Sequence, residues 1–246
     1  MIEQNGIPLA AVIVESIDGL FMMTLAIRAI VRYRQKQSKV TLYLMFGLFL
    51  YAFAALISGI TKYIDFVSNV GRDVVSYSTL GILVAYCMMS LANVFFALLL
   101  TELFLKDKNQ FPFFISIASF IIIGLIIPHI APVDGAYDEI TFYLFFFILV
   151  TMLLHGSLAR RAFSESRNSQ SKLTSMGFKL IAGFSILVIA TLVFFITDLV
   201  YGQITNGGYT IFYYIGWITV GLATLCGFLG YIMPAWFRNM IQPTTI

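Results

Sequence analysis

Seven long apolar stretches, separated by short polar segments, constrain this chain of 246 residues more than any other feature. A hydrocarbon core of about 30 Å is crossed by about 20 apolar residues of helix, and lipid leaves no partner for an unpaired backbone group. The predicted spans are 9–31, 41–63, 79–105, 113–128, 140–158, 178–200 and 209–235. We therefore predict an all-α integral membrane protein, a seven-helix bundle in a single domain over residues 1–240 with a short tail, 241–246.

The composition agrees with a protein whose main partner is the lipid bilayer. Apolar residues make up 60% of the chain and charged residues 11%, and the mean hydropathy is +0.92. Soluble domains are about half apolar and about a quarter charged. The net charge of +3 is therefore no sign of nucleic-acid binding. The fourth and fifth spans are the shortest, and Pro128, Pro132 and Asp134 separate them.

The basic residues fall almost wholly on alternate connections, which predicts the orientation. One side carries Arg32, Arg34, Lys36, Lys39, Lys106, Lys108, Arg160, Arg161, Arg167, Lys172 and Arg238. The other side carries Lys62 and Arg72 together with most of the acidic residues. Because cytoplasmic loops are enriched in Lys and Arg, we predict a multi-pass protein of the cell membrane with its N-terminus outside and its C-terminus inside. No basic stretch or cleavage pattern precedes the first span, so we expect that span to be retained.

Ionisable residues inside the spans are the first candidates for a functional site, because charge is costly in hydrocarbon. At 1.5 Å per residue, Asp18 lies about 21 Å and Glu15 about 25 Å above Arg32, in the outer half of the first span. Their spacing of three residues places both carboxylates on one face of a helix. We expect this face to point into the bundle rather than toward lipid.

Other polar residues are predicted at a similar depth on neighbouring helices. The predicted ligand-binding set is Glu15, Asp18, Tyr86, Ser90, Asn93, Thr191, Asp198 and Trp217. If these faces converge, they form an acidic, aromatic-rimmed cavity open to the outside, for a small-molecule or lipid ligand. Simpler interpretations stay open: Lys62 and Asp198 as interfacial residues that reach water, the aromatic residues as a membrane belt, and the small polar residues as hydrogen bonds between helices.

At the cytoplasmic side, the segment from Arg160 to Lys172 is predicted as the longest connecting loop, basic and rich in serine. We expect Arg160, Arg161, Arg167 and Lys172 to form a surface for a cytoplasmic partner, the alternative being a solvated loop that binds anionic lipid. Glu102 and His155 are each predicted near a helix end, where they could pair.

Small residues at spacings of four predict where helices approach closely. Such pairs are Ala55 with Gly59 in the second span, and Ala223 with Gly227 in the seventh. We expect the seventh helix to pack centrally or to contact another chain.

The chain lacks residues that several classes of membrane protein require. A retinal-linked pigment needs a lysine within the membrane, and the seventh span contains none, so covalently bound retinal is not expected. Metalloprotease and serine-hydrolase motifs do not occur, and the chain has only two His and two Cys residues. We therefore predict no enzyme activity, no metal site and no cofactor.

The end of the seventh span, from Gly227 through Tyr231, Pro234 and Trp236 to Arg238, resembles the last span of the seven-helix sensory regions found in prokaryotic histidine kinases and related signalling proteins. The resemblance covers this exit motif and the topology, and it implies a membrane sensory module. No kinase or other output domain follows here, so we expect output through a separate partner. Two alternatives stay open: a non-catalytic subunit of a larger membrane complex, and a small transporter or proton-coupled carrier.

Overall fold

The computed structural model describes residues 3–4, 7–68, 77–105, 110–130, 137–205 and 209–242. Helices account for nearly all of them. The elements are β1 (Glu3–Gln4), β2 (Ile7–Pro8), α1 (Leu9–Lys36), α2 (Lys39–Ser68), α3 (Tyr77–Phe104), α4 (Phe111–Ile126), the 3-10 helix η1 (Ile127–Ile130), α5 (Tyr137–Asn168), α6 (Lys172–Thr205), α7 (Ile211–Ile232) and α8 (Ala235–Ile241). Arg72, Asp73, Lys106, Lys108 and Asp134, which contributed to the predicted charge asymmetry, lie outside the described residues.

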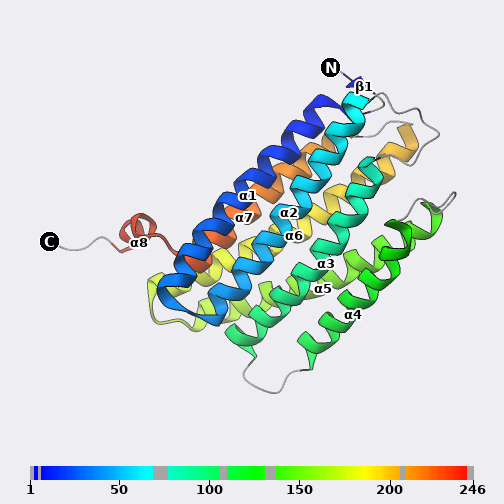
Figure 1. Cartoon of the computed structure of the whole chain (residues 1–246). Helices are drawn as coiled ribbons and strands as arrows, with labels where there is room; N and C mark the ends of the chain where they lie inside the picture. The colour runs from blue at the N-terminus through cyan, green and yellow to red at the C-terminus, as the bar shows by residue number, and fades with distance from the viewer. Residues whose placement is uncertain are drawn as a thin grey trace.

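The long helices form an up-and-down bundle in which consecutive helices are neighbours (Figure 1). α7 returns to α1, and α3 contacts α5 directly. α4 therefore lies at the outside of the bundle, against α3 and α5. The two ends of the chain lie at opposite ends of the bundle, as an odd number of spans requires (Figure 1).

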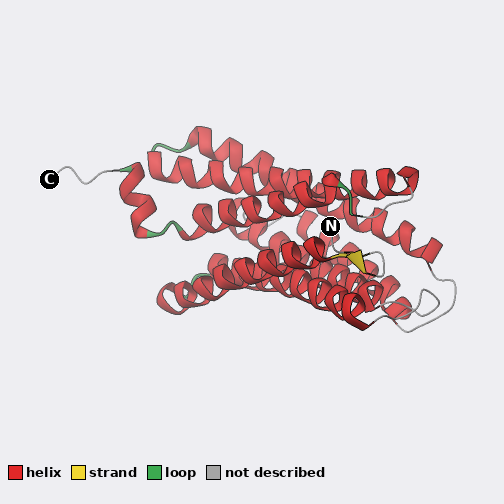
Figure 2. Cartoon of the chain, turned by 90° about the horizontal axis from the view of Figure 1, so that it is seen from above, coloured by secondary structure: helices red, strands yellow, loops and turns green. Residues whose placement is uncertain are grey.

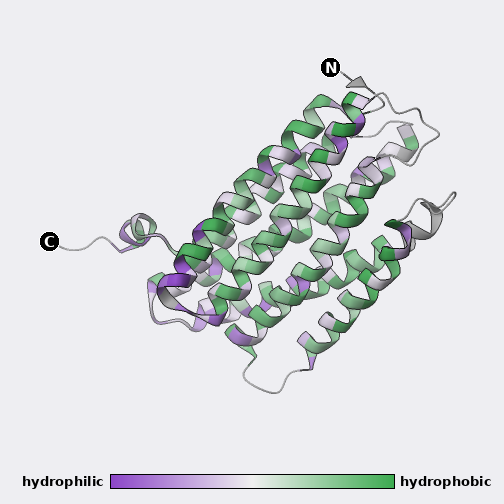
Figure 3. Ribbon diagram, in the orientation of Figure 1, coloured by the Kyte–Doolittle hydropathy of each residue, from purple (hydrophilic) through white to green (hydrophobic). Residues whose placement is uncertain are grey.

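Within the part of the chain that the structure describes, seven helices are long and apolar enough to cross a membrane. α4 shows why they suit lipid, because one of its faces packs on the bundle while the opposite face is exposed and wholly apolar. Its exposed large residues are Phe113, Phe114, Ile117, Phe120, Ile121 and Leu125. Hydrophilic segments gather toward the end of the bundle that carries α8, and the helix shafts are mostly hydrophobic (Figure 3). The all-α bundle predicted from hydropathy is therefore confirmed, and the structure is that of a multi-pass membrane protein.

Several helices extend past the spans predicted from hydropathy. α5 differs most, because it continues to Asn168 rather than ending at Leu158. The predicted long loop from Arg160 to Lys172 is therefore wrong: only residues 169–171 connect α5 to α6. Hydropathy detects the part of a helix that lies in lipid and misses polar turns that continue beyond it.

Left-handed residues end two of the helices. At the end of α1, Gln37 has φ 47° and its N–H donates to Tyr33 O at 2.7 Å, which allows a two-residue turn into α2. At the end of α7, Met233 has φ 44° and precedes Pro234, which cannot continue the helix. The predicted seventh span thus ends at Ile232, three residues early, and α8 turns away from the direction of the long helices (Figure 2).

Two apolar clusters stabilise the bundle. The larger contains Phe96, Phe147 and Phe184 and joins most of the helices. The smaller lies between α1, α2 and α7, and contains Ala11, Met22, Ala52, Ala55, Tyr213 and Trp217. This smaller cluster surrounds the candidate site.

Close helix contacts occur at the small residues singled out in α2 and α7. A Cβ added at Gly59 would lie 3.0 Å from Ser16 Oγ of α1, and one added at Gly227 would lie 3.1 Å from the ring of Phe184 in α6. The contacts lie within the chain. The predicted close approach of backbones is confirmed at Gly59, where the backbone N of Ser16 lies 3.4 Å from the added Cβ, whereas Gly227 makes room for the ring of Phe184.

The triplets α1–α3 and α5–α7 run in the same direction and share one detail. In each, the middle helix carries an aspartate that accepts a backbone N–H twelve residues later, at the start of the third helix. Asp65 accepts from Tyr77 N at 2.9 Å, and Asp198 accepts from Thr210 N at 2.7 Å. In both halves of the bundle, an aspartate near the end of the second helix thus binds the start of the third.

Candidate functional site

A buried ion pair joins α1 to α2 near the end of the bundle where the N-terminus lies. The ammonium of Lys62 donates to Oε1 of Glu15, and the side chains are 4% and 1% exposed. Glu15 lies six residues after the start of α1 and Lys62 six residues before the end of α2, about 9 Å inside each helix end. At this level the ammonium is buried, so the interpretation of Lys62 as a residue that reaches water is wrong.

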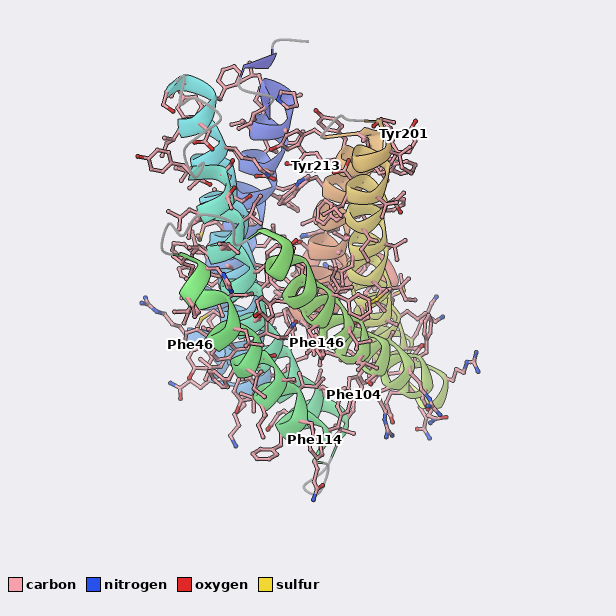
Figure 4. The ribbon with its side chains drawn as sticks, turned by 90° about the vertical axis from the view of Figure 1, so that its right-hand side faces the viewer. Phe46, Phe104, Phe114, Phe146, Tyr201 and Tyr213 are labelled. Atoms are coloured by element: carbon pink, nitrogen blue, oxygen red, sulfur yellow. The ribbon has the colours of Figure 1, made fainter. Side chains whose placement is uncertain are left out.

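Tyr213 of α7 completes the site. Its hydroxyl donates to Oε1 of Glu15, and the Lys62 ammonium lies 3.2 Å from the same hydroxyl oxygen. The ammonium also lies 5.2 Å from the ring centroid of Tyr213 and 5.5 Å from that of Tyr209, within range of cation–π attraction. Figure 4 shows Tyr213 near this end of the bundle, between α1 and α7. We call Glu15, Lys62, Tyr209 and Tyr213 the Glu15 cluster.

Tyr209 lies just before α7 with φ 59°. Burial raises the pKa of its hydroxyl above the ordinary value, and the negative charges of Glu15 and Asp198 raise it further. The phenol therefore stays neutral, with its ring available to the ammonium.

Two carboxylate oxygens beside the ion pair lack partners. Oε2 of Glu15 and Oδ2 of Asp18 are buried without a hydrogen bond to any described residue. Asp18 lies one turn deeper than Glu15, and its Oδ1 is 3.1 Å from the position of a Cβ at Gly221 in α7. A Cβ at this position of α7 would require the carboxylate to move by a few tenths of an ångström. The seam between α1 and α7 thus carries two carboxylates and one ammonium, with acceptors left for a further donor.

Trp217 forms a wall of the site, one turn below Tyr213. Its ring centroid lies 6.3 Å from that of Tyr213 and 5.7 Å from that of Phe195. The indole is mostly buried, and its Nε1 has no acceptor among the described residues. It packs in the smaller apolar cluster beside the ion pair.

Asp198 has a different position from the one predicted. Its Oδ1 accepts from the backbone N and from Oγ1 of Thr210, both at 2.7 Å, and Thr210 in turn accepts from Phe212 N as the N-cap of α7. Asp198 therefore holds the start of α7, which carries Tyr213, rather than contacting the ion pair.

Asp198→Ala is expected to lower the free energy of unfolding by about 1–2 kcal/mol, the range for loss of a helix cap. Thermal unfolding in detergent measures it. Asp198→Asn, which keeps an acceptor oxygen, should lose less. Equal unfolding temperatures for the alanine variant and the unaltered protein would contradict the capping role.

The polar residues of α3 belong to a separate group, facing α5. Asn93 Nδ2 donates to Thr151 Oγ1 at 2.8 Å, and the ring of Tyr86 lies 5.1 Å from that of Phe147. Ser90 is fully buried, and its hydroxyl has no partner among the described residues.

Thr191 donates to the carbonyl of Leu187 within α6, at 3.0 Å. The eight predicted ligand residues thus fall into more than one group. Glu15, Asp18 and Trp217 lie at the seam of α1 and α7, whereas Asn93 and Tyr86 contact α5 and Asp198 binds the start of α7.

His155 was predicted at a helix end near Glu102. It is fully buried, with its ring 5.6 Å from Phe96 and 5.3 Å from Phe184, and Nε2 is 3.4 Å from the Tyr51 hydroxyl. Glu102 is exposed, so the predicted pair is wrong. The reason is the length of α5, which places His155 well inside the helix.

The predicted cytoplasmic surface is also divided. Arg160, Arg161 and Arg167 are exposed on α5, and Lys172 is exposed at the start of α6. Arg160 and Arg167 line one groove together, and Arg161 and Lys172 lie outside its described lining.

Among the residues with described positions, no group of three His, Cys, Asp or Glu side chains could hold a metal ion. Cys87 and Cys226 are free and partly buried. The chemistry of the Glu15 cluster is therefore that of charge, hydrogen bonding and aromatic rings.

Comparisons of the chain with protein-family models, with curated proteins and with solved structures find no match. Its function has to be argued from the Glu15 cluster and its surroundings.

Proposed function

We propose that this chain is a membrane sensor of the receptor type, with its N-terminus outside the cell and its C-terminus in the cytoplasm. The Glu15 cluster is the element on which an outside signal acts. The observation that supports this proposal is the buried ion pair between α1 and α2, to which α7 is hydrogen bonded through Tyr213.

A buried ion pair in a membrane protein suits a switch, because its two charges are tolerated only together. A ligand with a cationic or hydrogen-bond-donating group competes with Lys62 for the same carboxylate. The unpartnered oxygens of Glu15 and Asp18 are acceptors for such a group. Once Glu15 is engaged elsewhere, the bonds that hold α7 to α1 and α2 weaken. A ligand shifts this equilibrium only if it binds the protein with different affinities when Glu15 is paired with Lys62 and when it is not.

The output follows from the position of α7. It begins beside the cluster, runs the length of the bundle, and leads through Met233 into α8 at the opposite end (Figure 1). A movement of α7 at the outer end therefore reaches the cytoplasmic end, where a separate signalling partner would respond.

The proposal predicts a distance between α1 and α7 that depends on the bonds made by Glu15. Spin labels at Leu20 and Ile218, which are 60% and 61% exposed, report it by pulsed electron resonance in nanodiscs, with Cys87 and Cys226 replaced. Glu15→Gln cannot form the ion pair with Lys62 and is expected to shift the distance distribution.

Glu102→Gln is the matched control, because Glu102 is an exposed carboxylate on another helix. It should keep the distance distribution of the unaltered protein. A distribution that Glu15→Gln leaves unchanged would sink the sensor proposal. A rigid bundle that purifies with fixed partners would then be better explained as a subunit of a membrane complex.

A carrier is the second candidate, favoured by the matching caps of Asp65 and Asp198 in the two helix triplets. Parallel structural repeats, related by an axis along the membrane normal, are one architecture of secondary transporters. The test is proton uptake into liposomes that contain the protein, followed with an internal pH dye under an imposed gradient. Uptake that Asp18→Asn abolishes would favour the carrier over the sensor.

A further inference from the structure

The end of α5 carries a basic groove that shares no residue with the Glu15 cluster. The groove has a volume of about 430 Å³, and its described lining is Arg160, Phe163, Ser164, Arg167 and Asn168. These residues recur at spacings of three and four, so they share one face of the helix. Both arginines and Phe163 are exposed.

The opposite face of this part of α5 is held firmly. Ala159 and Ala162 are buried there, and Ser166 is linked to Ser175 of α6. The Ser175 hydroxyl donates to Ser166 O at 2.9 Å, and the two hydroxyl oxygens lie 3.1 Å apart. The groove therefore lies on a fixed helix rather than on a loop.

Two observations place the groove at the membrane surface. From the exposed Phe145 to the exposed Phe163, α5 rises about 27 Å, close to the hydrocarbon thickness of about 30 Å. Independently, α8 lies across the bundle at this end with Trp236 and Met240 exposed, as a helix in the interface does (Figure 2). A methyl group of Met233, just before α8, touches the position of a Cβ at Gly177, two residues after Ser175.

We propose that this groove binds the headgroup of an anionic phospholipid from the surrounding leaflet. Arg160 and Arg167, separated by about 10 Å along the helix, bind the phosphate and any further acidic group of the headgroup, with Ser164 between them as a donor. Phe163 packs against the glycerol and upper acyl region. The site depends only on the bundle lying in a membrane, and it goes beyond the proposed sensor function.

A lipid fits this face better than an acidic protein. The exposed Phe163 belongs to the groove, and a large apolar ring between two cations matches a molecule with an acyl chain beside its charge. Arginines next to a membrane-spanning helix lie in the layer where anionic headgroups are concentrated. A protein partner would have to displace that lipid and enter the interface.

Native mass spectrometry of the full chain in detergent tests the site, with phosphatidylglycerol and phosphatidylcholine of equal acyl chains as probes. The unaltered protein should bind phosphatidylglycerol more tightly. The double variant Arg160→Gln/Arg167→Gln should bind it at least about tenfold more weakly, since one charge-assisted hydrogen bond to the phosphate contributes close to a factor of ten. Arg161→Gln/Lys172→Gln removes the same charge at the same end and should keep the affinity.

Competition with inorganic phosphate distinguishes a lipid site from a free-phosphate site. Comparison of the two double variants distinguishes a specific groove from attraction by net charge. Inorganic phosphate in excess should not displace phosphatidylglycerol; displacement would mean a free-phosphate site and overturn the lipid assignment. Equal loss in both double variants would mean attraction by net charge and no specific groove. Unchanged affinity in the Arg160→Gln/Arg167→Gln variant would also overturn the proposal, and would leave this face to an acidic protein. Equal unfolding temperatures should show that all variants are folded.

Discussion

Lys62→Met is expected to lower the free energy of unfolding by about 3–5 kcal/mol, the range for removing one partner of a buried ion pair. The Glu15 carboxylate, 1% exposed, would lose its only described cationic partner in a buried site. Tyr213 alone cannot neutralise that charge. At about 2–4 °C per kcal/mol for a chain of this size, the unfolding temperature should fall by roughly 6–20 °C.

A double-mutant cycle identifies the cause of this loss. Glu15→Gln removes the stranded charge, so Glu15→Gln/Lys62→Met should unfold at a higher temperature than Lys62→Met alone, and the two effects should not add. Lys39→Met is the control, because Lys39 is exposed at the start of the same helix; its effect should stay within about 0.5 kcal/mol. Equal losses for Lys62→Met and Lys39→Met would show that Lys62 is not buried as a charge.

The pairing of Glu15 with Lys62 was within reach of the sequence. Gln37 comes 22 residues after Glu15 and 25 residues before Lys62, so a tight turn at Gln37 places both side chains at about the same height on adjacent antiparallel helices. The missing information was the length of that turn. Hydropathy ends the first span at Val31, whereas polar residues continue α1 to Lys36.

The inward face of α1 was predictable for a simpler reason. Two carboxylates three residues apart cannot both face lipid, and both lie against the other helices. The mutual arrangement of the remaining polar residues was not predictable, because hydropathy gives the depth of a residue and not its direction around the bundle. Asn93 thus meets Thr151 of α5, and Asp198 meets the start of α7.

His155 shows the same limit at the other end of the bundle. Its depth depends on where α5 ends, and the ten residues after Leu158, nine of them polar or small, remain helical. Ala159 and Ala162 of α5, which are both buried, were the available sign that the amphipathic pattern continues.

Gly81→Ala is expected to lower the free energy of unfolding by about 1–3 kcal/mol, and Gly81→Leu by more, because α3 touches α2 at this glycine. An added Cβ would overlap Thr61 Oγ1 and lie 2.8 Å from Thr61 Cβ. Rotation of the threonine gives no relief, since its own Cβ is too close. Its hydroxyl is also engaged, with the carbonyl of Ile57 at 2.8 Å and that of Ser58 at 3.1 Å.

The control for this prediction is Gly124→Ala in α4, where an added Cβ meets nothing within 4 Å. Alanine there should raise stability slightly, through its higher helix propensity. The same propensity acts at Gly81, so the difference between the two variants measures the steric term. Thermal unfolding in one detergent gives both values. If Gly81→Ala unfolds at or above the temperature of Gly124→Ala, α2 and α3 do not approach as described. If Gly81→Ala unfolds at a lower temperature than Gly124→Ala, the added methyl group separates α2 from α3. This separation also displaces Lys62, the neighbour of Thr61. The Gly81→Ala protein should then show a weaker coupling energy between Glu15 and Lys62 in the double-mutant cycle.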